Sequence, residues 1–117
     1  MLIIMNLSKI TPKDLANQLL DRSTCKIKVA AVIEDNYGIY SWGWNHAGDG
    51  LGCHAEAMAI RRANPSRLKD STIYVVGKRN YSVYSLPCMA CMGRIIASGI
   101  SKIVFRDKLE NWITIVP

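Results

Sequence analysis

Two short stretches, with 30 residues between them, limit what this chain can be. The first, at 54–56, reads His-Ala-Glu, and the second, at 87–91, reads Pro-Cys-Met-Ala-Cys. Two cysteines three positions apart at a helix start put both sulfurs on one face, where the N-terminal end of the helix dipole favours thiolate over thiol. A histidine from a second helix start would add a third zinc ligand and leave the fourth tetrahedral position open for water, as in catalytic zinc sites. The pattern predicts a catalytic zinc centre with ligands His54, Cys88 and Cys91, and with Glu56 beside the water as a proton carrier.

These two elements resemble the cytidine deaminase superfamily, whose zinc members carry H-x-E followed by P-C-x-x-C, with the glutamate outside the metal's coordination shell. Either half alone would be a weak signal, because Cys-x-x-Cys also marks structural zinc and redox sites. Here the order, the separation, the proline before the first cysteine and the apolar helical run after each element all agree. The resemblance implies a zinc-dependent hydrolytic deaminase of nucleobases that works as a homo-oligomer.

The length fits one domain over residues 1–117, since 117 residues with 50% hydrophobic side chains supply a single moderate core. The resemblance implies a three-layer α/β/α fold around a mixed five-stranded sheet. Periodicity and capping signals predict helices at 11–22, 54–63 and 88–98, and strands at 26–34, 39–44, 71–76, 101–105 and 111–116. The last connection is far shorter than the dozen or more residues of a parallel crossover, so the fifth strand should be antiparallel.

Further residues are expected to contact substrate. In the resembling family a Gly-x-Asn element at a strand end places an amide against the nucleoside sugar, and Asn45 occupies that place here. Ala55, inside the His-Ala-Glu element, is included on the same basis. An insertion from Gly77 to Ser85 departs from the family pattern; its Tyr81 and Tyr84 could stack on a base, as in single-strand nucleic-acid sites, or could be ordinary residues of an exposed hairpin.

The substrate class stays open at this stage. Family members that act on free cytidine tend to have an antiparallel fifth strand, yet they usually present cysteine where this chain has His54. The first prediction is deamination of cytosine in a nucleoside or nucleotide. The alternative is deamination within a polynucleotide, either cytosine in single-stranded DNA or RNA or adenosine in transfer RNA, which the net charge of +6 would suit. The basic residues are scattered along the chain, which favours the first prediction.

A third possibility is a structural zinc module without chemistry. It would need a fourth protein ligand, for which Cys53, Cys25 and His46 are the candidates, and it would leave Glu56 without a purpose.

The N-terminal apolar run, residues 1–5, is shorter than a signal-peptide core, and no stretch approaches the roughly 20 apolar residues of a membrane span. Two of the four cysteines fit metal ligands, which favours a reducing compartment. We therefore expect a cytoplasmic protein without membrane contact.

Overall fold

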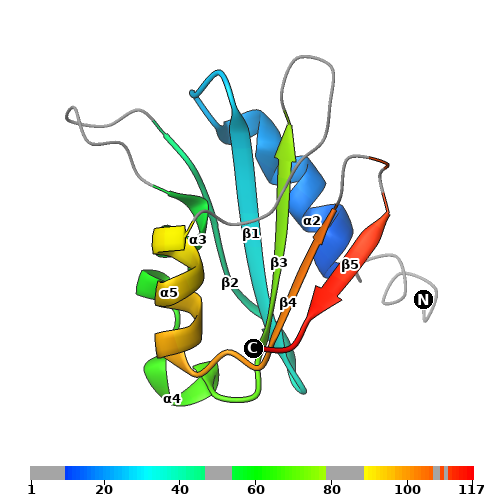
Figure 1. The fold of residues 1–117 in the computed structure, drawn as a ribbon. Coiled ribbons are helices and arrows are strands. Elements are labelled where there is room, and N and C mark those ends of the chain that lie inside the picture. Colours follow the sequence, from blue (N-terminus) through cyan, green and yellow to red (C-terminus); the bar gives the residue numbers. More distant parts are fainter. Residues whose placement is uncertain (1–9, 47–53, 79–88, 107–108, 110) are drawn as a thin grey trace, which may run out of the picture.

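The computed structural model describes residues 10–46, 54–78, 89–106, 109 and 111–117. Within them the chain forms a five-stranded mixed sheet of order β2-β1-β3-β4-β5, with helices on both faces (Figure 1). The strands are β1 (Lys28–Asp35), β2 (Gly38–Trp44), β3 (Thr72–Lys78), β4 (Lys102–Arg106) and β5 (Trp112–Ile115). Strands β3 and β4 are parallel, and the other neighbouring pairs are antiparallel. The predicted α/β fold, with its mixed sheet and antiparallel last strand, is confirmed.

A tight turn joins β1 to β2, as its Asp, Asn and Gly content predicts. The carboxylate of Asp35 accepts a hydrogen bond from the Tyr37 N–H at 2.9 Å, and Gly38 has a φ of +119°. Residues that have a side chain rarely adopt that backbone angle, so glycine suits the position.

The same hairpin contains a β-bulge. Ile33 pairs with Ser41 while Glu34 pairs with Ile39, so Tyr40 is an extra residue on β2. A bulge puts two consecutive side chains on the same side of a strand. Accordingly Tyr40 packs against the core on the α3 side, and the Ser41 hydroxyl also reaches α3.

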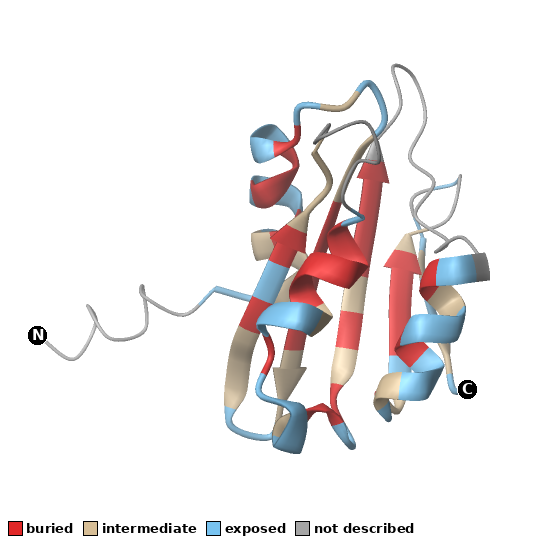
Figure 2. Ribbon diagram, turned by 90° about the vertical axis from the view of Figure 1, so that its left-hand side faces the viewer, coloured by how far each residue is buried: buried red, intermediate tan, exposed pale blue. Residues whose placement is uncertain are grey.

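Three helices cover one face of the sheet: α3 (Ala55–Arg62), α4 (Pro65–Leu68) and α5 (Met89–Ser98). The larger core cluster lies under them. It joins fully buried strand residues to residues of α3 and α5, and its members include Ala31, Ile33, Ile73, Val75, Ile103, Ala55, Ala59 and Ile95. Buried residues are concentrated in the central strands and in the first turns of α3 (Figure 2). This apolar layer holds α3 and α5 against the sheet.

The opposite face carries α2 (Pro12–Leu19), which ends in the 3₁₀ turn η1 (Leu20–Arg22). The helix begins as predicted, because the Thr11 hydroxyl accepts a hydrogen bond from the Asp14 N–H at 3.1 Å and proline occupies the first turn. The smaller core cluster, which includes Ala16, Leu19, Leu20, Ala30, Val32 and Val76, packs α2 against β1 and β3.

Two elements differ from the predictions. The helix that starts at Ala55 ends before Asn64-Pro65 as expected, but a short helix, α4, follows, with the Asn64 side chain accepting from the Ser66 N–H at 3.1 Å. Strand β3 also runs two residues beyond the predicted end, because Gly77 pairs with Val29 and Lys78 with Lys28. The expected insertion therefore begins after β3, and its remaining residues, 79–85, lie outside the described part of the chain.

None of the helices in the described ranges has the length and apolar character needed to cross a lipid bilayer.

Candidate functional site

Close packing of α3 on β2 positions the His-Ala-Glu element. A Cβ atom added to Gly43 would lie 2.6 Å from the Ala55 carbonyl oxygen and 2.8 Å from the Ala59 nitrogen, so the helix approaches the strand at a distance that only glycine permits. The hydroxyl of Ser41 donates to the Ala59 carbonyl at 2.6 Å and ties the same two elements together. In the sequence, Gly43 was indicated only as part of a Gly-x-Asn element, and its role in packing was missed. A glycine between two tryptophans on a strand was the signal that could have indicated a close approach of another element.

His54 is the residue immediately before α3, with extended backbone angles, and its imidazole makes no capping hydrogen bond to the helix. Its Nδ1 atom lies 3.2 Å from the Sγ atom of Cys91. Tetrahedral zinc with ordinary Zn–N and Zn–S bonds would hold two such atoms about 3.6 Å apart. The pair therefore fits two ligands of one zinc ion after a shift of a few tenths of an ångström.

Cys91 lies on α5, which packs beside α3 on the same face of the sheet (Figure 1), and it is buried, with an exposed fraction of 3%. Its predicted partner ligand, Cys88, lies outside the described residues. Among the described residues no three His, Cys, Asp or Glu side chains are grouped closely enough to hold a metal. Neither Cys25 nor His46 therefore completes a three-ligand group with His54 and Cys91 there; Cys53 is outside the described part.

Glu56 occupies the first turn of α3 and is 4% exposed, which is rare for a carboxylate that has no ion-pair partner within the described residues. Burial raises the pKa of its carboxyl group above the ordinary value, while its own backbone N–H, the nearby His54 and a hydrogen bond with Cys91 act in the opposite direction. The structure thus brings Glu56 together with two of the predicted zinc ligands. A raised pKa in a buried carboxyl is typical of groups that both accept and donate protons near neutral pH.

Asn45 directly follows β2, and its side chain is bonded within the protein. Its Oδ1 atom accepts from the Val29 N–H at 2.8 Å and from the Ser23 hydroxyl at 2.5 Å, and its Nδ2 atom donates to the Ile27 carbonyl at 2.7 Å. An amide nitrogen has two hydrogens, so one donor remains for another partner. No motif in the sequence indicated this anchoring role, and contact between Asn45 and a substrate stays a prediction.

The other predicted substrate contacts are placed less fully. Ala55 is completely buried, and its contact with a substrate stays a prediction; its N–H is one of the first helical amides, which lack an intrahelical acceptor. Tyr81 and Tyr84 lie outside the described residues.

The comparisons with known proteins agree with this geometry. Residues 11–107 match the family model "Cytidine and deoxycytidylate deaminase zinc-binding region".

Among solved structures, a cytidine deaminase from Burkholderia pseudomallei is similar, with 22% identity, a TM-score of 0.67 and 86% of each chain covered. A dCMP deaminase from the cyanophage S-TIM5, in apo form, has 23% identity and a TM-score of 0.66, covering 82% of this chain and 79% of the phage chain. A cytidine deaminase from Mycobacterium tuberculosis has 19% identity and a TM-score of 0.60, covering 81% and 80%. At these identities the likeness to solved structures establishes the fold.

The family model spans most of the chain and contains both the His-Ala-Glu element and the Pro-Cys-x-x-Cys element. This chain belongs to the cytidine and deoxycytidylate deaminase family.

Proposed function

We propose that this protein is a zinc-dependent hydrolase that converts a cytosine base to uracil in a nucleoside or nucleotide. The observation that carries the proposal is the buried carboxyl of Glu56 beside the His54–Cys91 pair. A carboxyl buried next to an apolar layer costs stability, and proton transfer at this point would explain its presence.

His54, Cys88 and Cys91 are the residues that would hold Zn²⁺. When bound there, zinc would lower the pKa of a water molecule toward neutrality and so supply a nucleophile. Two thiolates and one neutral imidazole balance the two positive charges of the ion.

Glu56 would move the protons. It would accept one from the attacking water and deliver it to the ring nitrogen next to the amine-bearing carbon, and would then take the proton of the newly added hydroxyl and pass it to the departing amine. Ammonia and the oxo base result. Burial supports this cycle, because a carboxyl group whose pKa is raised toward neutral pH can both accept and donate a proton, whereas an exposed one stays ionised.

The metal assignment is tested by zinc analysis of purified variants. Cys88→Ser and Cys91→Ser should each lose most of the one zinc expected per chain, because a removed thiolate leaves two ligands. Cys25→Ser and Cys53→Ser are the matched controls and should keep full occupancy. Equal loss in the Cys53 variant would overturn the ligand set and favour a structural zinc module.

The substrate is tested by measuring ammonia release from cytidine, deoxycytidine, their monophosphates, single-stranded DNA and transfer RNA. We expect release from a free nucleoside or nucleotide, and the antiparallel β5 favours the free nucleoside of the two. Absence of release from all six, by protein loaded with zinc, would contradict the proposal.

One observation favours the second candidate, deamination within a polynucleotide. Trp42, at the outer edge of the sheet, is 41% exposed, and next to it the guanidinium groups of Arg22 and Arg62 lie 5.3 and 5.2 Å from the ring centre of Trp44. Aromatic rings with cations are the contacts that single strands use. Activity on a strand would fall steeply with salt, by about one unit of log-log slope per phosphate contact. We expect the weak salt dependence of a small substrate.

We also propose a cytoplasmic location and a homo-oligomer. The use of cysteines as metal ligands supports the cytoplasmic location. Exposed apolar side chains support the homo-oligomer, since Ile96 on α5 is 53% exposed and Val116 after β5 is 71% exposed. Light scattering of the purified protein measures the oligomeric state, and a monomer would contradict the proposed homo-oligomer.

A further inference from the structure

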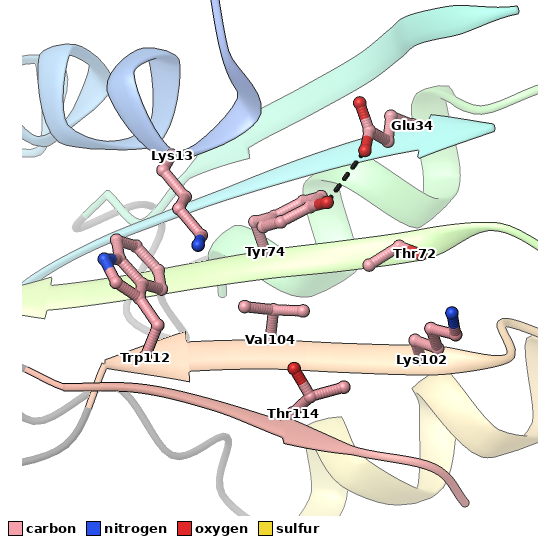
Figure 3. Close-up of a pocket in the computed structure, with 8 residues that line it drawn as sticks. All are labelled: Lys13, Glu34, Thr72, Tyr74, Lys102, Val104, Trp112 and Thr114. Atoms are coloured by element: carbon pink, nitrogen blue, oxygen red, sulfur yellow. Dashed lines mark hydrogen bonds between the residues drawn. The ribbon is translucent and has the colours of Figure 1, made fainter. Parts of the chain in front are cut away.

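The α2 face of the sheet contains a groove that the proposed chemistry does not use. It has a volume of about 430 Å³ and lies between α2 and the strands β3, β4 and β5 (Figure 3). Its lining residues are Lys13, Glu34, Thr72, Tyr74, Lys102, Val104, Trp112 and Thr114. His54, Glu56 and Cys91 belong to the α3 and α5 side of the sheet, so the groove and the candidate zinc site are separated by the sheet itself.

The groove has unbalanced positive charge. Lys13 enters it from α2 and Lys102 from β4, and neither ammonium lies within the 4.0 Å that defines an ion pair with any carboxylate of the described residues. Its one carboxylate, Glu34, accepts a hydrogen bond from the Tyr74 hydroxyl at 2.7 Å.

A third cation lies next to the groove, on the same side of the sheet. Trp112 has the Lys13 ammonium 4.9 Å and the Arg106 guanidinium 5.7 Å from its ring centre. The Nε atom of Arg106 is buried and has no hydrogen-bond partner among the described residues. Two lysines and one carboxylate in the lining, with Arg106 beside Trp112 and its Nε unpaired within the described residues, favour an anionic ligand.

The size and the lining chemistry narrow the ligand class. A volume of 430 Å³ falls in the range of roughly 300 to 1,000 Å³ that holds organic ligands, so a bare anion would fill it poorly. Besides the cations, the lining offers the hydroxyls of Thr72 and Thr114 and the ring of Trp112. Hydroxyls bind the polar body of a ligand, and an indole can contact a planar ring.

Two other occupants fit less well. The apolar N-terminal run of this chain, residues 1–5, does not match a floor of hydroxyls and charged groups. A second copy docked symmetrically by this face would bring Lys13 and Lys102 toward their own counterparts, and like charges repel.

We propose that this groove binds a phosphate-bearing small molecule of nucleotide size. Lys102 holds the phosphate at one end of the groove, the hydroxyls of β3 and β5 hold the body of the ligand, and Trp112, with Lys13 beside it, contacts the ring at the other end (Figure 3). The site is independent of the deamination proposed above, because it uses none of the same residues.

The test is a titration of the full-length, zinc-loaded protein followed by NMR of its three tryptophan indole N–H signals. The Trp112 signal is identified with a Trp112→Phe variant. The added probes are guanosine monophosphate, guanosine, ribose 5-phosphate and inorganic phosphate. Guanosine monophosphate should shift the Trp112 signal in a saturable way while the signals of Trp42 and Trp44 stay in place.

The other probes separate the parts of the ligand. Guanosine should shift the Trp112 signal only at much higher concentration, since it lacks the phosphate. Ribose 5-phosphate and inorganic phosphate should bind more weakly than guanosine monophosphate. Equal binding of inorganic phosphate would overturn the size argument and reduce the groove to an adventitious anion site.

Variants test the assigned contacts. Lys102→Ala should weaken the binding of guanosine monophosphate about tenfold, the ordinary effect of one charge-assisted contact. Lys69→Ala removes an exposed charge elsewhere and should leave the affinity unchanged. Glu34→Gln keeps an acceptor for Tyr74, removes the only negative charge of the groove, and should tighten binding by a few fold.

Three results would overturn the proposal: no shift with any probe, equal weakening in Lys69→Ala, or a shift of the Ala55 amide in place of the Trp112 signal. The last would place the nucleotide at the candidate zinc site. A Trp112 signal that moves with protein concentration alone would assign the groove to self-association instead.

Discussion

The two faces of the sheet are built from the same strands, yet they differ in chemistry. The face toward α3 and α5 presents mostly apolar side chains from the three central strands, among them Ala31, Ile33, Ile73, Val75, Ile103 and Phe105. The face toward α2 is apolar only where the helix covers it. Beyond the helix it presents Glu34, Thr72, Tyr74, Lys102 and Thr114.

Each face therefore supplies a different setting for a carboxylate. On the α3 side Glu56 is buried next to a thiol and an imidazole, and burial raises the pKa of its carboxyl group. On the α2 side Glu34 is half-buried and accepts a hydrogen bond from Tyr74. Under the two proposals, the apolar layer serves proton transfer at Glu56, and the polar layer serves ligand binding by charge and hydroxyl groups.

The largest expected effect comes from the apolar face. Glu56→Gln should keep zinc and the fold but reduce kcat by roughly 10²- to 10⁴-fold, the usual loss when a general acid/base is removed. Asp14→Asn, an exposed carboxylate on α2, is the matched control and should stay within about twofold of the wild type. Steady-state kinetics with parallel zinc analysis measures both. Near-normal turnover in the Glu56 variant would refute its role.

A smaller effect should follow from crowding the same face. Gly43→Ala would force a methyl group against backbone atoms of α3 at 2.6 and 2.8 Å, and the unfolding free energy should fall by about 1 to 3 kcal/mol. Zinc affinity should fall with it, since α3 carries His54. The control is Gly93→Ala on α5, where nothing lies within 4 Å of the added atom. There a gain of up to about 1 kcal/mol is expected from helix propensity. Urea titrations that show equal stability for the two variants would contradict the packing account.

The smallest effect belongs to the polar face. Burial, together with the hydrogen bond to Glu34, raises the pKa of Tyr74 to about 12, above its ordinary value of 10.0. The neutral phenol is favoured in the folded state, so this stabilisation is complete below pH 10 and is lost as the pH rises toward 12. Wild-type stability should therefore fall more steeply than that of Tyr74→Phe across this window.

Tyr37→Phe is the control for that experiment, because Tyr37 is 93% exposed. Its stability curve should run parallel to the wild-type curve in urea titrations between pH 9 and 12. Parallel curves for Tyr74→Phe and the wild type would show that the polar face does not hold this phenol as described.

Local chemistry made much of the fold predictable. The Thr11 cap, the Asp35–Gly38 turn and the short connection before β5 each fix backbone geometry within a few residues, and the structure has all three. The His-Ala-Glu element likewise predicted that His54 and Glu56 would lie near Cys91.

Features that depend on distant segments were not predictable in the same way. The internal bonds of Asn45 require β1 and the segment before it to lie beside the end of β2. The closeness of α3 to Gly43 is a property of two packed elements, not of a motif. The groove depends on how far α2 extends over the sheet, and no local motif predicts that distance. The sequence of β4 indicated only that Lys102, Val104 and Arg106 share one face of the strand.

The extra residue at Tyr40 determines which face of the sheet each later side chain of β2 points to. Because successive side chains point to opposite sides, deleting one residue from the hairpin would turn the rest of the strand over. Trp42 or Trp44 would then face α3 in the place where Gly43 now permits close contact. We therefore expect the hairpin to tolerate the insertion or deletion of two residues but not of one. In this way a turn far from His54 determines whether α3 can pack against β2.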